Sequence, residues 1–259
     1  MSLDIPAALT DGLSRIPTRV AATLFAAYLA VGAISTVAAQ TLSLAVVDAL
    51  RTTVPADAAA PTTPGMGGGA LALDVGLPVA AALFLTQVVL AQVVGVVGIR
   101  TFVSDARTSF PSGVTSHLTW VVLNALVAGF VVNVLTGLGA ILLVIPGIYV
   151  AVALYFVQFE VAIEEHNAVE ALRTGWELTK GERLRVFLLL LVIFALGLTS
   201  AVPSVVLGFV GAPTPVVVAA SILVGAVAGL LSVAIGARAY VQLKPDGWSP
   251  SFGTTSPFA

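Results

Sequence analysis

The chain has 259 residues, of which 58% are hydrophobic and only 9% are charged, and its formal net charge is −2. Soluble domains contain about 25% charged residues, so this composition excludes an ordinary soluble globular protein. The chain has no cysteine, which excludes disulfide bonds, cysteine nucleophiles and thiolate metal sites.

Six apolar stretches with few charges determine the predicted fold class. Most of them exceed the roughly 20 apolar residues needed to cross the ~30 Å hydrocarbon core of a bilayer. We therefore expect an all-α, polytopic membrane protein with a bundle of six transmembrane helices. The stretches cover residues 20–47, 75–99, 118–136, 140–163, 186–206 and 216–241.

The basic residues predict which ends of these spans lie in the cytoplasm. If all six stretches cross the membrane, ten of the eleven basic residues fall on one side, and only Arg51 falls on the other. The positive-inside rule makes the basic side cytoplasmic. We expect a cell-membrane protein with a transmembrane domain at 20–243, a cytoplasmic N-terminal segment at 1–19 and a cytoplasmic C-terminal tail at 244–259.

One sizeable loop, at about 48–74, connects the first two spans on the opposite side. Its middle is rich in alanine, proline, glycine and threonine and shows no hydrophobic periodicity. Such a segment cannot bury enough apolar surface to offset the entropy lost on ordering. The sequence predicts a flexible external loop.

Small residues recur every four positions in two of the spans. This spacing lets helix backbones approach closely. We expect packing faces, either within the bundle or between protomers, at Gly129, Asn133 and Gly137 and at Gly225 and Gly229.

Span four contains the pair Pro146-Gly147. Proline in a helix interior removes a hydrogen bond and clashes with the preceding turn, so we expect a helix break there. Broken helices form the binding sites of some transporters. A small-solute permease that uses this break is therefore one functional alternative.

Ionisable residues are absent from the middle of every span. Glu160 is the deepest, about one turn from the cytoplasmic end of span four, where we expect it to reach the interface or a nearby arginine; a proton or cation site is the alternative. His117 and His166 both fall on the cytoplasmic side. We expect two solvated histidines rather than a metal site with Glu164 or Glu165.

A cytoplasmic amphipathic helix is predicted at about 167–181, after span four. Asn167 and Glu170 have the spacing of an N-cap and an acidic third residue, and Gly181 is placed to end the helix. Apolar residues at i, i+3 and i+7 predict one buried stripe along a helix that lies in the membrane interface. These residues are Val169, Leu172 and Trp176.

Basic residues surround this helix and make it a candidate contact for lipid or a partner. Each basic residue near an anionic leaflet contributes about 1 kcal/mol of attraction. The alternative is a helix that only connects spans four and five, with Trp176 packed against their ends. The candidate contact residues are Arg173, Trp176, Lys180, Arg183 and Arg185.

Three runs in this half of the chain carry a resemblance to a known family. They are IPGIY at 145–149, FEVAIEE at 159–165 and EALRTGWELTKGER at 170–183. The region 141–192 resembles the multi-helix domain related to the membrane part of glycerophosphoryl diester phosphodiesterases, which also has stand-alone archaeal members. Nine arginines against two lysines fit a GC-rich genome such as that of a halophile or an actinomycete. Gly175 departs from the serine usual in that family.

The resemblance implies a membrane domain and no phosphodiesterase activity. In those proteins the chemistry belongs to a separate soluble barrel, and no segment outside the spans here is long enough to form one. We expect a non-enzymatic membrane module that organises lipid or a partner protein, with a homo-oligomer as one form of this assembly. We expect no catalytic residue, no cofactor, no metal and no nucleic-acid partner.

Overall fold

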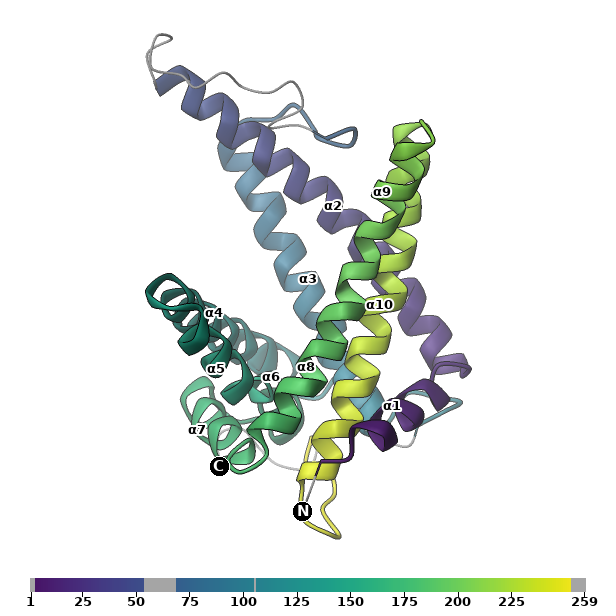
Figure 1. Ribbon diagram of the computed structural model, residues 1–259, viewed down its shortest axis with the longest axis vertical. Coiled ribbons are helices and arrows are strands. Elements are labelled where there is room, and N and C mark those ends of the chain that lie inside the picture. The colour runs from purple at the N-terminus through teal and green to yellow at the C-terminus, as the bar shows by residue number, and fades with distance from the viewer. Residues whose placement is uncertain (1–2, 54–68, 105, 253–259) are drawn as a thin grey trace.

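The computed structural model describes residues 3–53, 69–104 and 106–252, and all regular elements in these ranges are helices (Figure 1). Six helical segments are long and apolar enough to cross a membrane, which confirms the all-helical fold and the predicted long apolar helices. The predicted flexibility of the loop at 48–74 concerns mainly residues 54–68, which lie outside the described residues.

The chain runs through ten α-helices and one 3₁₀ turn within the described ranges. Spans four and five are each divided into shorter helices. The elements are α1 (Ile5–Ser14), α2 (Arg19–Thr53), α3 (Leu77–Val103), α4 (Leu118–Leu142), α5 (Val144–Ala153), α6 (Val157–Glu164), α7 (Ala168–Leu178), α8 (Arg183–Leu198), η1 (Thr199–Ala201), α9 (Val202–Phe209) and α10 (Thr214–Leu243).

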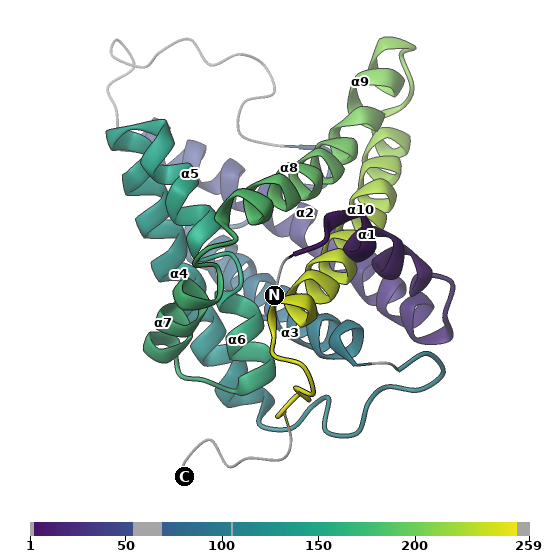
Figure 2. The ribbon, with the colours of Figure 1, turned by 60° about the horizontal axis from the view of Figure 1, so that its bottom comes forward.

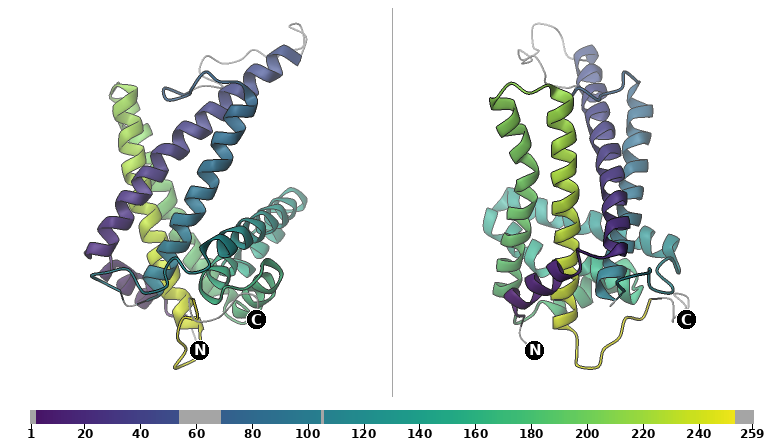
Figure 3. Two further views of the ribbon diagram at one scale, coloured as in Figure 1. Left: turned by 180° about the vertical axis from the view of Figure 1, so that it is seen from behind. Right: turned by 90° about the vertical axis from the view of Figure 1, so that its right-hand side faces the viewer.

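The helices converge at one end of the molecule and diverge toward the other. Helices α2, α3 and α10 pack along one another, and α8 to α9 run beside α10 (Figure 3). The α4–α5 hairpin leans away from this group, and its tip is separate from the other helices (Figure 1). We call the converging end, where α3, α6 and α10 finish and α2, α4 and α8 begin, the basic end.

Burial follows this arrangement. The buried residues of α4 all lie between Val121 and Ala128, in the half of the helix nearest the basic end. At the hairpin tip the side chains from Ile141 to Ile145 are each at least 67% exposed, although all of them are apolar. The apolar core of the described chain is therefore concentrated at the basic end, and the outer halves of the arms present apolar surface outward.

The N-terminal segment contains a helix that the sequence did not predict. Asp4 caps α1 by accepting a hydrogen bond from the Ala7 backbone N–H at 3.0 Å. Helix α1 lies across the end of α10 (Figure 2). Gly12 permits this contact, because a Cβ atom there would lie 3.1 Å from the Cα atom of Ile235. The first described residues thus pack against the last third of α10.

The expected break at Pro146-Gly147 is not inside a helix. Leu143 alone joins α4 to α5 in an extended conformation, and Pro146 falls in the first turn of α5. A first-turn backbone N–H has no partner within the helix, so proline costs little there. Span four is interrupted instead between Ala153 and Val157, where α5 ends and α6 begins.

The small size of Gly147 allows α5 to pack closely against α4. A Cβ atom on Gly147 would lie 2.6 Å from the Ala140 backbone nitrogen, and one on Gly139 would lie 2.9 Å from the Gly147 Cα atom. The two glycines let α4 and α5 touch backbone to backbone. No described atom of another element lies within 4 Å of a Cβ atom built on Gly137. The hairpin therefore packs through Gly139 and not through the predicted Gly137.

The other predicted packing residues behave differently in α4 and in α10. Gly129 lies against the amide of Gln158, but Asn133 is exposed and donates to the Gly129 carbonyl of its own helix at 2.8 Å. In α10, a Cβ atom on Gly225 would lie 3.6 Å from Ser200, and one on Gly229 would lie 3.3 Å from Tyr28. The α10 glycines therefore pack inside the bundle.

Candidate functional site

A buried ion pair ties α3 to the end of α6. Arg100 has 0% of its surface exposed, and its Nη2 atom donates to Glu165 Oε1 at 2.8 Å. Its other nitrogens donate to backbone carbonyls, including Ala162 at 2.7 Å and Ser116 at 2.8 Å. A buried charge is tolerated only when it is paired and its donors are satisfied, and this guanidinium meets both conditions.

His117 shares the same carboxylate from the start of α4. Its Nδ1 atom lies 2.8 Å from Glu165 Oε2. Both residues adopt a left-handed backbone conformation, with φ of 48° at His117 and 56° at Glu165, and they stand at the boundaries of α4 and α6. His117 contacts one oxygen of Glu165 and Arg100 the other, so Glu165 joins α3, α4 and α6.

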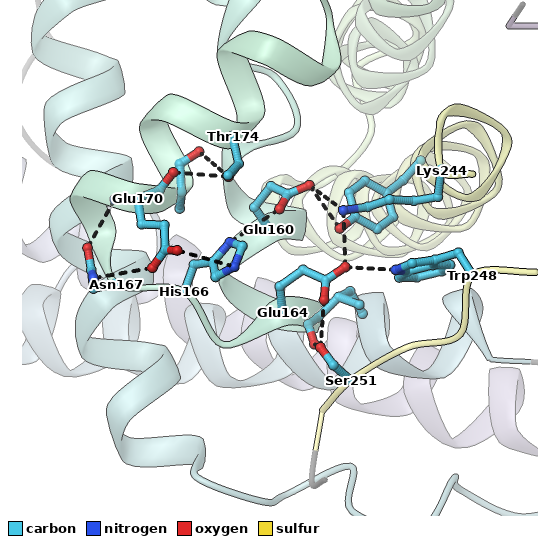
Figure 4. A network of polar contacts seen from close by, with 12 residues as sticks. Glu160, Glu164, His166, Asn167, Glu170, Thr174, Lys244, Trp248 and Ser251 are labelled. Atoms are coloured by element: carbon cyan, nitrogen blue, oxygen red, sulfur yellow. Dashed lines mark hydrogen bonds and ion pairs between the residues drawn. The ribbon is translucent and has the colours of Figure 1, made fainter. Parts of the chain in front are cut away.

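A second buried carboxylate ties α6 to α10. Glu160 is 1% exposed and accepts from Lys244 Nζ at 2.8 Å and from the Tyr240 hydroxyl at 3.0 Å (Figure 4). The sequence predicted that Glu160 would reach the interface or a nearby arginine. The partner is a lysine from the end of α10 instead.

Glu164 holds the segment that follows α10. It accepts from Trp248 Nε1 at 2.9 Å and from the Ser251 hydroxyl at 2.6 Å, and Lys244 Nζ lies 3.0 Å away (Figure 4). Phe252, the last described residue, covers the Arg100 guanidinium, whose Cζ atom lies 5.2 Å from the ring centroid. The described part of the C-terminal tail therefore folds back over α6.

The two histidines are not simply solvated, as the sequence analysis expected. His166 Nδ1 lies 3.4 Å from Glu160 Oε2, at an ion-pair distance without hydrogen-bond geometry, and its Nε2 atom lies 3.7 Å from Glu170. The contact with Glu160 raises the pKa of His166, while partial burial acts in the opposite direction. Within the described ranges, no three His, Asp or Glu side chains are placed to share a metal ion.

These contacts show what Glu160, Glu164 and Glu165 do. We call the three side chains the α6 carboxylates. Each one accepts from at least two groups on other elements. The α6 carboxylates hold the converging helices together at the basic end. Sequence reasoning identified Glu160 as the deepest acid, but it identified neither Lys244 as the partner of Glu160 nor Arg100 as the partner of Glu165.

Helix α7 begins where the sequence predicted, and small residues form the face that it packs on the protein. The Asn167 side chain caps it by accepting from the Glu170 backbone N–H at 3.0 Å. Of the predicted stripe, Leu172 packs against the core, whereas Val169 is 78% exposed and Trp176 is 37% exposed. The placement of this stripe in the membrane interface stays a prediction. The buried face consists of small residues at the same helical spacing, namely Ala168, Ala171, Gly175 and Thr179.

Close packing against α6 explains why this face consists of small residues. A Cβ atom on Gly175 would lie 3.2 Å from the Cα atom of Val157 and 2.8 Å from its side chain. A larger residue at position 175 would therefore clash with Val157. Small residues form the face in contact with α6, Leu172 and Leu178 pack beside it on the core, and Val169 and Trp176 are exposed.

Trp176 takes part in a cation–π arrangement with the first residue of α8. The Arg183 Cζ atom lies 4.5 Å from the Trp176 ring centroid and 4.7 Å from that of Tyr149, and the two rings meet edge to face. Arg183 also donates from Nη1 to the Tyr149 hydroxyl. Its Nε atom is buried and has no hydrogen-bond partner among the described residues. We call Tyr149, Trp176 and Arg183 the Arg183 cage.

The remaining predicted contact residues differ in whether they form ion pairs. Arg185 donates to Glu182 at 2.8 Å, and Arg173 pairs with Glu177 at 3.3 Å along the exposed side of α7. Lys180 is exposed. The structure thus brings Trp176 and Arg183 together and leaves the other three basic residues outside the cage.

Apolar side chains extend from the cage along two helices. Tyr149 belongs to α5 and Arg183 to α8, and these helices contact each other. Ile148 is 44% exposed on α5, and Leu184 is 73% exposed on α8. The Arg183 guanidinium therefore lies next to an exposed apolar surface.

Comparison with known families gives one result. The chain matches the family described as a domain of unknown function, DUF7847, over residues 3–243, and it belongs to that family. No curated protein and no solved structure matches the chain. The resemblance to the membrane domain of glycerophosphoryl diester phosphodiesterases stays a prediction.

Proposed function

We propose that this DUF7847 protein is a multi-pass protein of the cell membrane that binds anionic lipid at the Arg183 cage, as a non-enzymatic module. The six long apolar helices support the membrane location. The distribution of basic residues supports a cytoplasmic location for the basic end and for both termini. The connection between α9 and α10 then lies outside.

The Arg183 cage is the observation that carries the lipid assignment. Two aromatic faces fix the guanidinium in place, so little side-chain entropy is lost when it binds an anion. None of the ion pairs within the described ranges includes Arg183, and guanidinium groups recognise phosphate through charge-assisted N–H donors. Tryptophan and tyrosine are enriched at the level of lipid headgroups, where the proposed orientation puts this site.

The exposed apolar surfaces of α5 and α8 complete the site. A phospholipid whose phosphate meets Arg183 can lay its acyl chains on these surfaces, including Ile148 and Leu184. A permease at Pro146-Gly147 has less support, because the two residues begin α5 and do not interrupt a helix. A second copy or another membrane protein could also cover the α4–α5 tip, but no charged group marks that surface.

Arg183→Gln is expected to reduce the retention of anionic phospholipid about fivefold, since one basic residue near the leaflet contributes about 1 kcal/mol. Native mass spectrometry of protein extracted in mild detergent with equal amounts of phosphatidylglycerol and phosphatidylcholine measures this retention. Arg185→Gln is the matched control, because its guanidinium already pairs with Glu182. Equal retention by the two variants would show that the cage only braces α7 against α5 and α8.

A further inference from the structure

We propose a second lipid site, in which the groove enclosed by α1, α2 and α10 takes one acyl chain of an anionic phospholipid whose phosphate lies at Arg19. This inference rests on the proposed membrane orientation but not on the Arg183 cage. The groove is formed by other helices.

The groove is apolar throughout. Its volume is about 550 Å³, which lies in the range of about 300–1,000 Å³ typical of small-molecule sites. Its lining includes Leu13 from α1, Phe25 from α2 and Leu231 from α10, and every other lining residue is also apolar. A groove without a hydrogen-bonding side chain selects a hydrocarbon over a polar solute.

Small side chains on α2 and the position of α1 create this space. Ala21 and Ala22 line the groove where larger residues would fill it. Helix α1 is fixed against α10 by the close contact of Gly12 with Ile235, so it cannot move in to close the gap. The turn after α1 brings Pro17 to the rim.

The charge at the rim indicates an anionic headgroup. Arg19 is the first residue of α2, between the lining residues Pro17 and Ala21, and its side chain is exposed. None of the ion pairs found in the described ranges includes Arg19. The nearest described carboxylate on α1, Asp11, is already shared by Arg15 and Arg238.

The depth of the groove fits a lipid better than a soluble ligand. Both α2 and α10 are long enough to cross the membrane, and the groove lies between the first two turns of α2 and the middle of α10. In the proposed orientation Arg19 meets the cytoplasmic headgroup layer, and Phe25, nearly two turns further along α2, lies toward the hydrocarbon. A lipid whose phosphate meets Arg19 and whose acyl chain lies beside Phe25 would fit both the charged rim and the apolar groove.

The test fills the groove and counts bound lipid. Ala22 is exposed, so Ala22→Phe occupies the groove without disturbing the core, and Ala30→Phe places the same side chain on an exposed position of α2 outside the groove. Native mass spectrometry with phosphatidylglycerol should show one fewer bound lipid for Ala22→Phe than for wild type or Ala30→Phe. Retention of the wild-type number by Ala22→Phe would overturn the proposal.

A second variant separates the headgroup from the chain. Arg19→Gln should lose the preference for phosphatidylglycerol over phosphatidylcholine at this site while the groove still takes a chain. An unchanged preference would remove Arg19 from the proposal. Because Ala22→Phe and Arg183→Gln affect different sites, their losses should add in the double variant, and either site can fail without the other.

Discussion

Arg100→Met is expected to lower the free energy of unfolding by about 3–5 kcal/mol, the usual cost of removing one partner of a buried ion pair. Methionine fills much of the arginine volume, so the loss comes mainly from the polar contacts. Glu165 would keep His117 but lose its buried cation, and the carbonyls of Ala162 and Ser116 would lose a donor. Unfolding in detergent micelles with increasing SDS measures the effect.

Arg173→Met is the matched control for this measurement. Its pair with Glu177 is exposed, with 81% and 62% of the two side chains accessible. Exposed pairs contribute about 0–1 kcal/mol, so the unfolding midpoint should hardly move. Replacing both Arg100 and Glu165 with methionine should recover part of the lost stability, because no uncompensated charge is left. Equal midpoints for Arg100→Met and Arg173→Met would contradict the account of the basic end.

Gly139→Ala is expected to destabilise the protein by roughly 1–3 kcal/mol through overpacking. The new methyl group would lie 2.9 Å from the Cα atom of Gly147, and a backbone atom cannot move away as a flexible side chain can. The α4–α5 hairpin would have to open at its tip. The thermal midpoint in detergent reports the loss, and faster amide exchange in α5 locates it.

Gly137→Ala tests the same substitution two residues earlier in α4. No described atom lies within 4 Å of its added Cβ atom, so no clash follows. Alanine is a better helix former than glycine by about 0.5–1 kcal/mol, and the midpoint should stay or rise. A midpoint that falls as far as that of Gly139→Ala would mean that Gly137 packs against another molecule, such as a second protomer.

Hydropathy alone was sufficient to predict the helical class and the six long apolar helices. A hydrocarbon environment requires every backbone polar group to be bonded within the helix, so composition and length give a strong signal. The Asn167 cap was also predictable, because it depends on residues three apart in the sequence. Helix α1 was missed, since it is short and lies outside the apolar stretches.

The contacts of the α6 carboxylates could not be predicted from sequence spacing. Arg100 and Glu165 are 65 positions apart, and Glu160 and Lys244 are 84 apart. Their pairing depends on how α3, α6 and α10 converge, which no local pattern encodes. The available signal was the cluster of three glutamates at the end of an otherwise uncharged span, which requires nearby cations.

The apolar stripe of α7 was predicted from the spacing of its larger apolar residues, which does not identify the face that packs on α6. Helix α6 approaches so closely at Val157 that only Ala171, Gly175 and other small residues fit between the two helices. In a membrane protein the outward face can also be apolar, so amphipathicity does not by itself say which face packs. Trp176 consequently points toward Arg183 and Tyr149.

Two-sided cysteine labelling tests the proposed membrane orientation most directly, and the chain has no native cysteine to interfere. Ser109 is exposed between α3 and α4, and Thr214 is exposed at the start of α10, at the opposite end of the bundle. With an impermeant maleimide added to intact cells, Thr214→Cys should react, and Ser109→Cys should react only after the membrane is permeabilised. Labelling of both positions in intact cells, or of Ser109→Cys alone, would contradict a six-span protein whose basic end lies in the cytoplasm.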